Sequence, residues 1–96
     1  MSRIIKNNPR LILNEIKWKE KFDLEKIIIY YLHWGAVDNT KVLFGGEIKL
    51  IGRSFIETNS FHMPYHRILK IKYDDKIIFD RNRLYDNYLM INIIYL

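Results

Sequence analysis

The stretch MPYHRILKIKY, residues 63–73, decides the fold class of this 96-residue chain. From Ile68 onward, apolar and charged side chains alternate, which is the period of a strand with one face in the core and one in water. A polar connection at residues 74–76 and an apolar return at residues 77–79 complete the pattern of a hairpin. The side chains predicted to face the core are those of Leu69, Ile71 and Tyr73. This pattern predicts antiparallel strands as the basic unit of the fold.

Two segments nearer the N-terminus show an equally clear preference for one type of secondary structure. Residues 27–32, IIIYYL, form a continuous β-branched and aromatic run, which is typical of a central strand. Asn8 and Pro9 fit a helix start, because Asn caps free backbone N–H groups and Pro suits the first helical position. The apolar spacing that follows predicts a short helix over residues 9–17.

Weaker patterns fill the middle of the chain. Residues 42–44 and 47–50 are predicted strands, separated by a turn at a pair of glycines. Gly52 predicts a bulge or a close approach of two backbone segments, after which residues 53–57 continue the strand. Residues 59–64 are a predicted loop.

These elements predict an α+β fold, with a mainly antiparallel sheet and a short N-terminal helix packed on it. A chain of this length is expected to form a single domain, residues 1–96. The tail at residues 84–96 is apolar and fits either a last strand or a helix.

Composition narrows the class of protein. The chain is 49% apolar and 28% charged, which favours a globular domain over a disordered one. It contains no cysteine, which excludes disulfides, thiolate metal sites and cysteine nucleophiles. The formal charge of +5 suggests an anionic partner, nucleic acid first and an anionic membrane second, and it also lies in the range of ordinary soluble domains. With no stretch of ~20 apolar residues and no signal-peptide pattern, a cytoplasmic protein is expected.

Residues that can do acid–base work or bind anions stand at the ends of the predicted strands. His33 and Arg53 each follow a strand, and Tyr65, His66 and Arg67 precede the clearest one. Strand ends near loops are where rigid scaffolds usually place sites. In an extended strand, Tyr65 and Arg67 point to one face and His66 to the other, so all three meet one ligand only if the backbone bends there. A half-buried core aromatic with its hydroxyl in water is the commoner role for Tyr65.

Two histidine pairs suggest other chemistry. His62 and His66 have a helical metal-ligand spacing, but Pro64 lies between them and no third ligand is evident, so no metal site or cofactor is predicted. His33 and His66 fit an acid–base pair of the kind used to cleave RNA through the ribose 2′-hydroxyl. The two-histidine phosphoesterases carry His-x-Thr or His-x-Ser twice, and neither triplet occurs here.

Four motifs together resemble one protein family. They are LNEIKW at residues 13–18, IIYYLHWGA at 28–36, IGRSFIET at 51–58 and MPYHRILKI at 63–71. In order and spacing they resemble a family of small, mostly archaeal proteins, long classed as uncharacterised and described as the RNA cyclic-group end recognition domain, a predicted RNA-repair module. The resemblance covers roughly residues 9–80. The tail at residues 82–96 has no counterpart in it and is expected to be an appendage or an oligomer contact.

The resemblance implies a set of residues that bind RNA or its phosphate. They are His33, Trp34, Arg53, Ser54, Tyr65, His66 and Arg67. Relatives usually carry Arg at the position of Trp34, so this chain has a stacking surface there in place of a positive charge. The implied partners are RNA 3′ ends and RNA-repair, ligase or phosphoesterase proteins, with no membrane.

The favoured hypothesis is an RNA-binding module that recognises RNA ends bearing a 2′,3′-cyclic phosphate, in RNA repair or processing. The cyclic phosphate is a monoanion, so recognition requires a few donors in a fixed shape more than a maximal positive charge. Arg53 or Arg67 can clamp its non-bridging oxygens, and His33 and His66 can donate single hydrogen bonds. Two alternatives stay open: a small ribonuclease or cyclic phosphodiesterase that uses the two histidines, and a non-catalytic protein-interaction domain.

Overall fold

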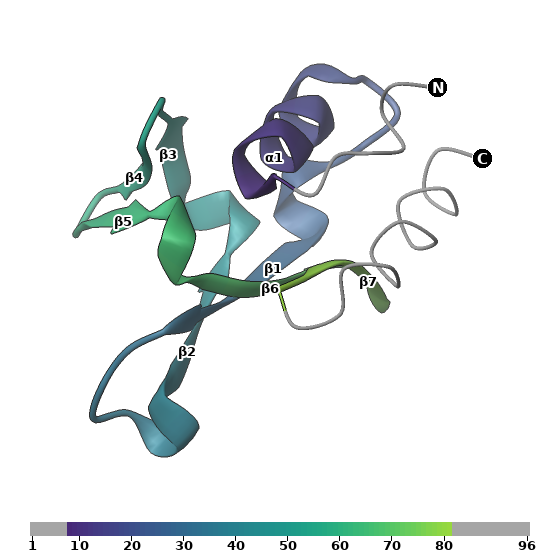
Figure 1. The fold of residues 1–96 in the computed structure, drawn as a ribbon. Coiled ribbons are helices and arrows are strands. Elements are labelled where there is room, and N and C mark those ends of the chain that lie inside the picture. The colour runs from purple at the N-terminus through teal and green to yellow at the C-terminus, as the bar shows by residue number, and fades with distance from the viewer. Residues whose placement is uncertain (1–7, 82–96) are drawn as a thin grey trace.

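The computed structural model describes residues 8–81, which form one α-helix and two antiparallel sheets (Figure 1). The helix is α1 (Pro9–Trp18), and the strands are β1 (Ile27–Leu32), β2 (Thr40–Phe44), β3 (Ile48–Ile51), β4 (Phe55–Thr58), β5 (His62–Pro64), β6 (Ile68–Tyr73) and β7 (Lys76–Asp80). Single 3₁₀ turns lie between them: η2 (Leu24–Lys26), η3 (Val37–Asn39), η4 (Gly45–Glu47) and η5 (Tyr65–Arg67). The predicted α+β class is confirmed.

The helix α1 forms where its capping signal stands. Asn8 Oδ1 accepts hydrogen bonds from the backbone N–H groups of Arg10 (2.9 Å) and Leu11 (3.4 Å), and Pro9 occupies the first turn. Its inner face buries Ile12, Leu13 and Ile16, which join buried side chains from both sheets in one core. In Figure 1 the helix lies over β1 and β6, with β3 beside it. The predicted helix is confirmed and is one residue longer than expected.

The larger sheet has the strand order β2-β1-β6-β7, so β1 is an inner strand, as predicted. Ile29 pairs with Leu43 on one side and with Ile71 on the other, and each of these side chains is at most 1% exposed. A turn at Asp74 and Asp75 joins β6 to β7, which confirms the predicted hairpin.

The predicted core face of β6 is only partly right. Ile71 is buried, but Leu69 and Tyr73 are half-buried, and Ile68 is fully buried instead. The register with β1 skips one residue of β6 between the paired positions Lys70 and Ile68. Leu69 is therefore the extra residue of a bulge, which shifts the alternation by one position and turns Ile68 toward the core.

The smaller sheet has the order β3-β4-β5 and corrects the prediction that residues 53–57 continue a strand. The chain reverses at Arg53 and Ser54, and β4 returns antiparallel to β3. The Gly52 N–H donates to the Phe55 carbonyl at 2.9 Å, and a Cβ at Gly52 would lie 2.9 Å from that same oxygen. Glycine permits this approach, so the predicted contact of two backbone segments is confirmed.

Residues 59–64 are not a loop throughout, which corrects a second prediction. His62–Pro64 pair with β4 as an edge strand, a position where proline is tolerated. The expected strands at residues 42–44 and 47–50 correspond to β2 and β3. The glycine pair between them lies in the 3₁₀ turn η4.

Three predictions are not decided by this part of the chain. The tail at residues 84–96 and the appendage at residues 82–96 lie outside the described residues. A single domain over residues 1–96 stays a prediction. Within residues 8–81, no helix has the length and apolar character needed to span a membrane.

Candidate functional site

A depression of about 690 Å³ lies where four distant chain segments meet. Its described lining residues are Asn8, Pro9, Arg10, Arg53, Tyr65, His66 and Arg81. They come from the start of α1, the turn between β3 and β4, η5 and the position after β7. The described lining therefore holds three arginines and one histidine and no carboxylate. We call this hollow the arginine depression.

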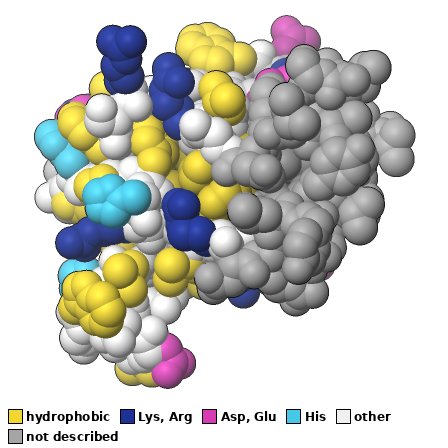
Figure 2. Space-filling view, in the orientation of Figure 1, with side chains coloured by type: hydrophobic (Ala, Val, Ile, Leu, Met, Phe, Trp, Pro, Cys, Tyr) yellow, Lys and Arg dark blue, Asp and Glu magenta, His cyan; other side chains and the backbone are white. Residues whose placement is uncertain are grey.

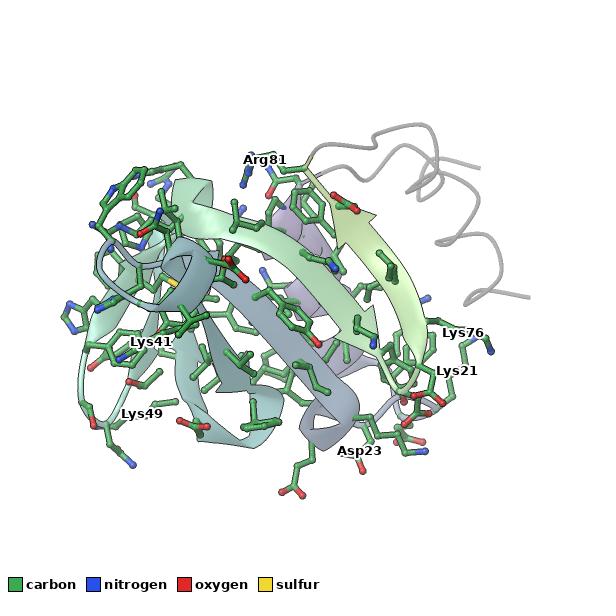
Figure 3. The ribbon with its side chains drawn as sticks, turned by 90° about the horizontal axis from the view of Figure 1, so that it is seen from below. Lys21, Asp23, Lys41, Lys49, Lys76 and Arg81 are labelled. Carbon is green, nitrogen blue, oxygen red and sulfur yellow. The ribbon has the colours of Figure 1, made fainter. Side chains whose placement is uncertain are left out.

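Arg81 holds one wall of the arginine depression in place. Its Nε donates to the Ile68 carbonyl at 2.7 Å, and its Nη2 donates to the Tyr65 carbonyl at 2.9 Å. Its backbone N–H donates to the Leu69 carbonyl at 2.9 Å, and its guanidinium lies 5.2 Å from the centre of the Phe79 ring. Figure 3 shows Arg81 at the end of β7, opposite Lys76 at the start of that strand. Arg81 thus fixes η5 from both ends, and its remaining donors border the depression.

Tyr65 links η5 to the turn that carries Arg53. Its hydroxyl donates to the Gly52 carbonyl at 2.6 Å. Burial raises the pKa of Tyr65 above its ordinary value, and the nearby charge of Arg10 opposes that rise. The neutral hydroxyl therefore stays a donor at neutral pH and holds the backbone next to Arg53.

Arg10 stands in an unfavourable place. It lies in the first turn of α1, where the helix dipole disfavours a cation and where no acidic residue is present. Its Nε is buried, and none of the described residues accepts a hydrogen bond from it. A buried donor without a partner costs about 1–3 kcal/mol, and more when the group is charged. Such a group calls for an acceptor, and an ordered water or a bound ion is the usual one.

A second depression, of about 480 Å³, lies on the other side of η5. Its described lining residues are Tyr31, His33, Lys41, Phe61, His62, Met63, Pro64 and Arg67. The ring centres of Tyr31 and Phe61 are 6.0 Å apart, and those of Tyr31 and His33 are 6.4 Å apart. We call this hollow the aromatic depression. Figure 2 shows histidine and basic side chains gathered among apolar ones on one side of the described surface.

The chain bends between the two depressions. Pro64 ends β5, η5 follows, and β6 begins at Ile68, so the expected strand entrance at MPYHRI is a 3₁₀ turn. Because of this bend, Tyr65 and His66 line the arginine depression, while Pro64 and Arg67 line the aromatic depression.

The predicted site residues are divided between these two places. Arg53 and His66 line the arginine depression with Tyr65, and His33 lines the aromatic depression with Arg67. The two histidines of the proposed acid–base pair therefore lie in different hollows. Their catalytic role, like the binding role of every predicted residue, stays a prediction.

Trp34 and Ser54 are absent from the described lining of both hollows. Trp34 is 69% exposed in the connection between β1 and β2. Ser54 is exposed at the β3–β4 reversal, directly after Arg53. Both side chains are accessible at loop tips, one at each sheet.

Sequence reasoning missed Arg10 and Arg81. Arg10 belongs to a run of basic residues near the N-terminus, and such a run usually forms a solvated face. A usable signal was its place in the first helical turn after Asn8 and Pro9, where a cation opposes the helix dipole. No local pattern marks Arg81, because its hydrogen bonds are with η5 and β6, at least 12 residues earlier in the chain.

Comparison with known proteins tests the family resemblance independently of the structure. A sequence profile described as the MJ1316 RNA cyclic group end recognition domain matches residues 7–81, from before α1 to just after β7. The chain belongs to this family. The resemblance inferred from the four motifs is thereby confirmed, and the matched range includes every described residue that lines the two depressions.

The similar curated proteins come from archaea and are named only as UPF0248 proteins. One from Methanococcus vannielii is 41% identical over 61 residues, which cover 64% of this chain and 73% of the relative. One from Methanococcus maripaludis is 37% identical over 60 residues, covering 62% and 78%. One from Methanopyrus kandleri is 25% identical over 61 residues, covering 64% and 82%. No solved structure matches the chain.

Proposed function

We propose that the protein binds RNA ends that carry a 2′,3′-cyclic phosphate and that the arginine depression receives the phosphate. The observation that carries this proposal is the meeting of Arg10, Arg53, His66 and Arg81 in one hollow whose described lining contains no carboxylate. The family description names the same class of ligand. Cleavage of RNA by attack of the ribose 2′-hydroxyl leaves such ends, so a protein that binds them belongs to RNA repair or processing.

The chemistry of the cyclic end suits this hollow. A cyclic phosphate is a monoanion with two non-bridging oxygens, and a planar guanidinium offers a matching fork of donors. Arg53 is exposed, and the hydrogen bond from the Tyr65 hydroxyl to the Gly52 carbonyl holds the backbone next to it. Arg10 supports the same assignment, because an anion in the depression could accept from its Nε, for which the described residues offer no acceptor. Arg81 acts as a positioning residue, since its guanidinium is bound to two backbone carbonyls.

Binding measurements with matched RNA ends test the proposal. One short RNA is prepared with a 2′,3′-cyclic phosphate or with a 3′-hydroxyl, and its Kd is measured by fluorescence anisotropy at 50 mM salt. Arg53→Ala and Arg10→Ala are each expected to weaken binding of the cyclic-ended RNA by about tenfold, the range of a lost charge-assisted hydrogen bond, with a much smaller loss for the hydroxyl-ended RNA.

The control for these variants is Lys76→Ala, which removes an exposed cation at the opposite end of β7 from Arg81 (Figure 3). It is expected to leave both affinities within twofold. Equal weakening of the two RNAs by Arg53→Ala would show a contact with the RNA backbone and not with the cyclic end. Recovery of the RNA after incubation, with a search for an opened ring, tests the phosphodiesterase alternative in the same samples.

A further inference from the structure

The two depressions are separated by one short wall of chain. Tyr65 and His66 lie on the arginine side, and Arg67 lies on the aromatic side, one residue further along. Consecutive Cα atoms are ~3.8 Å apart, so the backbone of His66, which borders one hollow, adjoins that of Arg67, which borders the other. A terminal phosphate and the nucleotide before it are joined covalently over a comparably short span.

We propose that the aromatic depression is a second nucleotide subsite, which binds the nucleotide that precedes the cyclic end of the RNA. Its base stacks on Phe61 near Tyr31, and its phosphate lies against Arg67 and Lys41. This inference rests on the proposed function, because it assumes that the cyclic phosphate occupies the arginine depression.

The ring of Phe61 is prepared for stacking. Phe61 is 36% exposed, and its backbone is held by Thr58, which is only 6% exposed. Thr58 N–H and Thr58 Oγ1 donate to the Phe61 carbonyl at 2.9 and 3.1 Å, and the Phe61 N–H donates to Thr58 Oγ1 at 3.1 Å. The ring of Tyr31 lies behind it, at 6.0 Å and tilted by 33°. Because the backbone of Phe61 is already held, the residue loses little further conformational entropy when a base packs on its exposed ring.

The charges around the rings select an anion. Lys41 is the cross-strand partner of Tyr31, and Figure 3 shows it at the side of the larger sheet. Burial and, to a smaller degree, the charge of Glu47 raise the pKa of Tyr31, and the nearby charge of Arg67 opposes that rise. No carboxylate is among the described lining residues, although Glu57 lies 3.7 Å from His62 at the rim. We therefore assign the phosphate contact to Lys41 and Arg67 and not to His62.

A nucleotide fits these features better than a peptide does. Base stacking accepts any base, because every base has a π face, and cations beside the ring hold the backbone phosphate. An acidic peptide would also meet the cations, but its carboxylates and backbone offer no π face to stack on the exposed ring of Phe61. A protein partner is therefore treated as an outcome of the test.

The test compares ligands of increasing length. The probes are a 2′,3′-cyclic mononucleotide, a dinucleotide and a trinucleotide, the last two with cyclic ends, all measured in competition with a labelled trinucleotide. The dinucleotide is expected to bind about tenfold more tightly than the mononucleotide, the range of one stacked base. The third nucleotide is expected to add less than threefold.

Two variants locate the effect. Phe61→Ala is expected to abolish the gain from the second nucleotide and to leave the mononucleotide affinity within twofold. Lys41→Gln is expected to reduce that gain by about threefold, and it tests the subsite separately if Phe61→Ala fails to fold. The matched control is Phe44→Ala, because Phe44 is 52% exposed and is absent from the described lining of either hollow.

The possible failures are distinguishable. Equal affinity of the mononucleotide and the dinucleotide would overturn the second subsite and leave the proposed function standing. An equal effect of Phe61→Ala on both ligands would also overturn it, since the ring would then contact the terminal base. If Phe61→Ala changes no nucleotide affinity, the aromatic depression is not the second nucleotide subsite, and a protein becomes the alternative occupant to test. If cyclic ends of every length bind no better than hydroxyl ends, the proposed function itself fails.

Discussion

The two depressions beside η5 share a wall but are built by different routes. The described cations of the arginine depression come from segments up to 71 positions apart, Arg10 and Arg81, and hydrogen bonds to backbone carbonyls fix its walls. The rings of the aromatic depression come from β1 and from the short turn between β4 and β5, where Thr58 holds Phe61. Selection of charge thus depends on long-range packing, whereas the stacking surface depends mostly on a local turn.

This difference predicts that the arginine depression is the more fragile of the two. Loss of Arg81 there should shift a whole wall, because its guanidinium binds the carbonyls of Tyr65 and Ile68, at the two ends of η5. Substitution at the aromatic depression removes one ring and leaves the surrounding strands paired. The four predictions below test this contrast, from the largest expected effect to the smallest.

Arg81→Ala is expected to have the largest effect. The change removes the donors to the Ile68 and Tyr65 carbonyls, two charge-assisted bonds, and should lower the free energy of unfolding by about 2–3 kcal/mol. Urea unfolding measures the loss, with Lys76→Ala as the control. A loss below ~0.5 kcal/mol, the range of an ordinary surface substitution, would show that η5 is held by other contacts.

Salt should weaken binding of the cyclic-ended RNA. If the arginine depression and Arg67 neutralise about two phosphate groups on a single strand, the logarithmic salt slope is about −1.4, and raising salt from 50 to 200 mM weakens binding roughly sevenfold. Arg53→Ala should lower the slope to about −0.7, and Phe61→Ala should leave it unchanged. If both variants change the salt slope equally, the arginine depression does not contribute more of the charge contacts than Phe61 does, and the contrast between the two depressions is wrong.

Tyr65→Phe should lower the free energy of unfolding by about 1 kcal/mol, because it deletes the hydrogen bond to the Gly52 carbonyl. The wild-type contribution depends on pH in a defined direction. Burial raises the pKa of Tyr65 in the folded state, so its stabilising effect is complete below the ordinary tyrosine pKa near 10 and is lost as pH rises through the higher value.

The measurement for Tyr65→Phe is urea unfolding of both proteins at pH 7 and at alkaline pH. The difference in stability between them should shrink as pH rises above ~10. Tyr31, whose pKa is also raised by burial, is present in both proteins and does not affect that difference. A constant difference across this range would show that Tyr65 does not ionise differently in the folded chain.

Arg10→Ala is expected to have the smallest effect on stability, and in the opposite direction. It removes a cation from the first turn of α1 and a buried donor that no described residue satisfies, so the free energy of unfolding should rise by about 0.5 kcal/mol. The same variant should bind cyclic-ended RNA less tightly. A variant that is both less stable and unchanged in binding would make Arg10 a structural residue.

The contrast between the hollows also explains what sequence reasoning found. The β6–β7 hairpin, the inner strand β1 and the capped start of α1 were predicted correctly, since period, β-branched runs and an Asn-Pro cap are local signals. The bulge at Leu69 was missed, because one skipped residue leaves no mark in the composition of the strand. The reversal at Arg53 was missed for a similar reason, since Gly52 fits both a bulge and a hairpin connection.

The sequence by itself determined the α+β class, the family and the presence of an aromatic, a histidine and an arginine side chain in the MPYHRI stretch. Each of these follows from residue order over short stretches. Only the tertiary structure decided that η5 divides those residues between two hollows and that Arg10 and Arg81 join Arg53 and His66 in one of them. The physical reason is distance along the chain. Contacts between α1, the β3–β4 turn and the end of β7 arise when the two sheets and the helix close on a common core, and no local pattern encodes that closure.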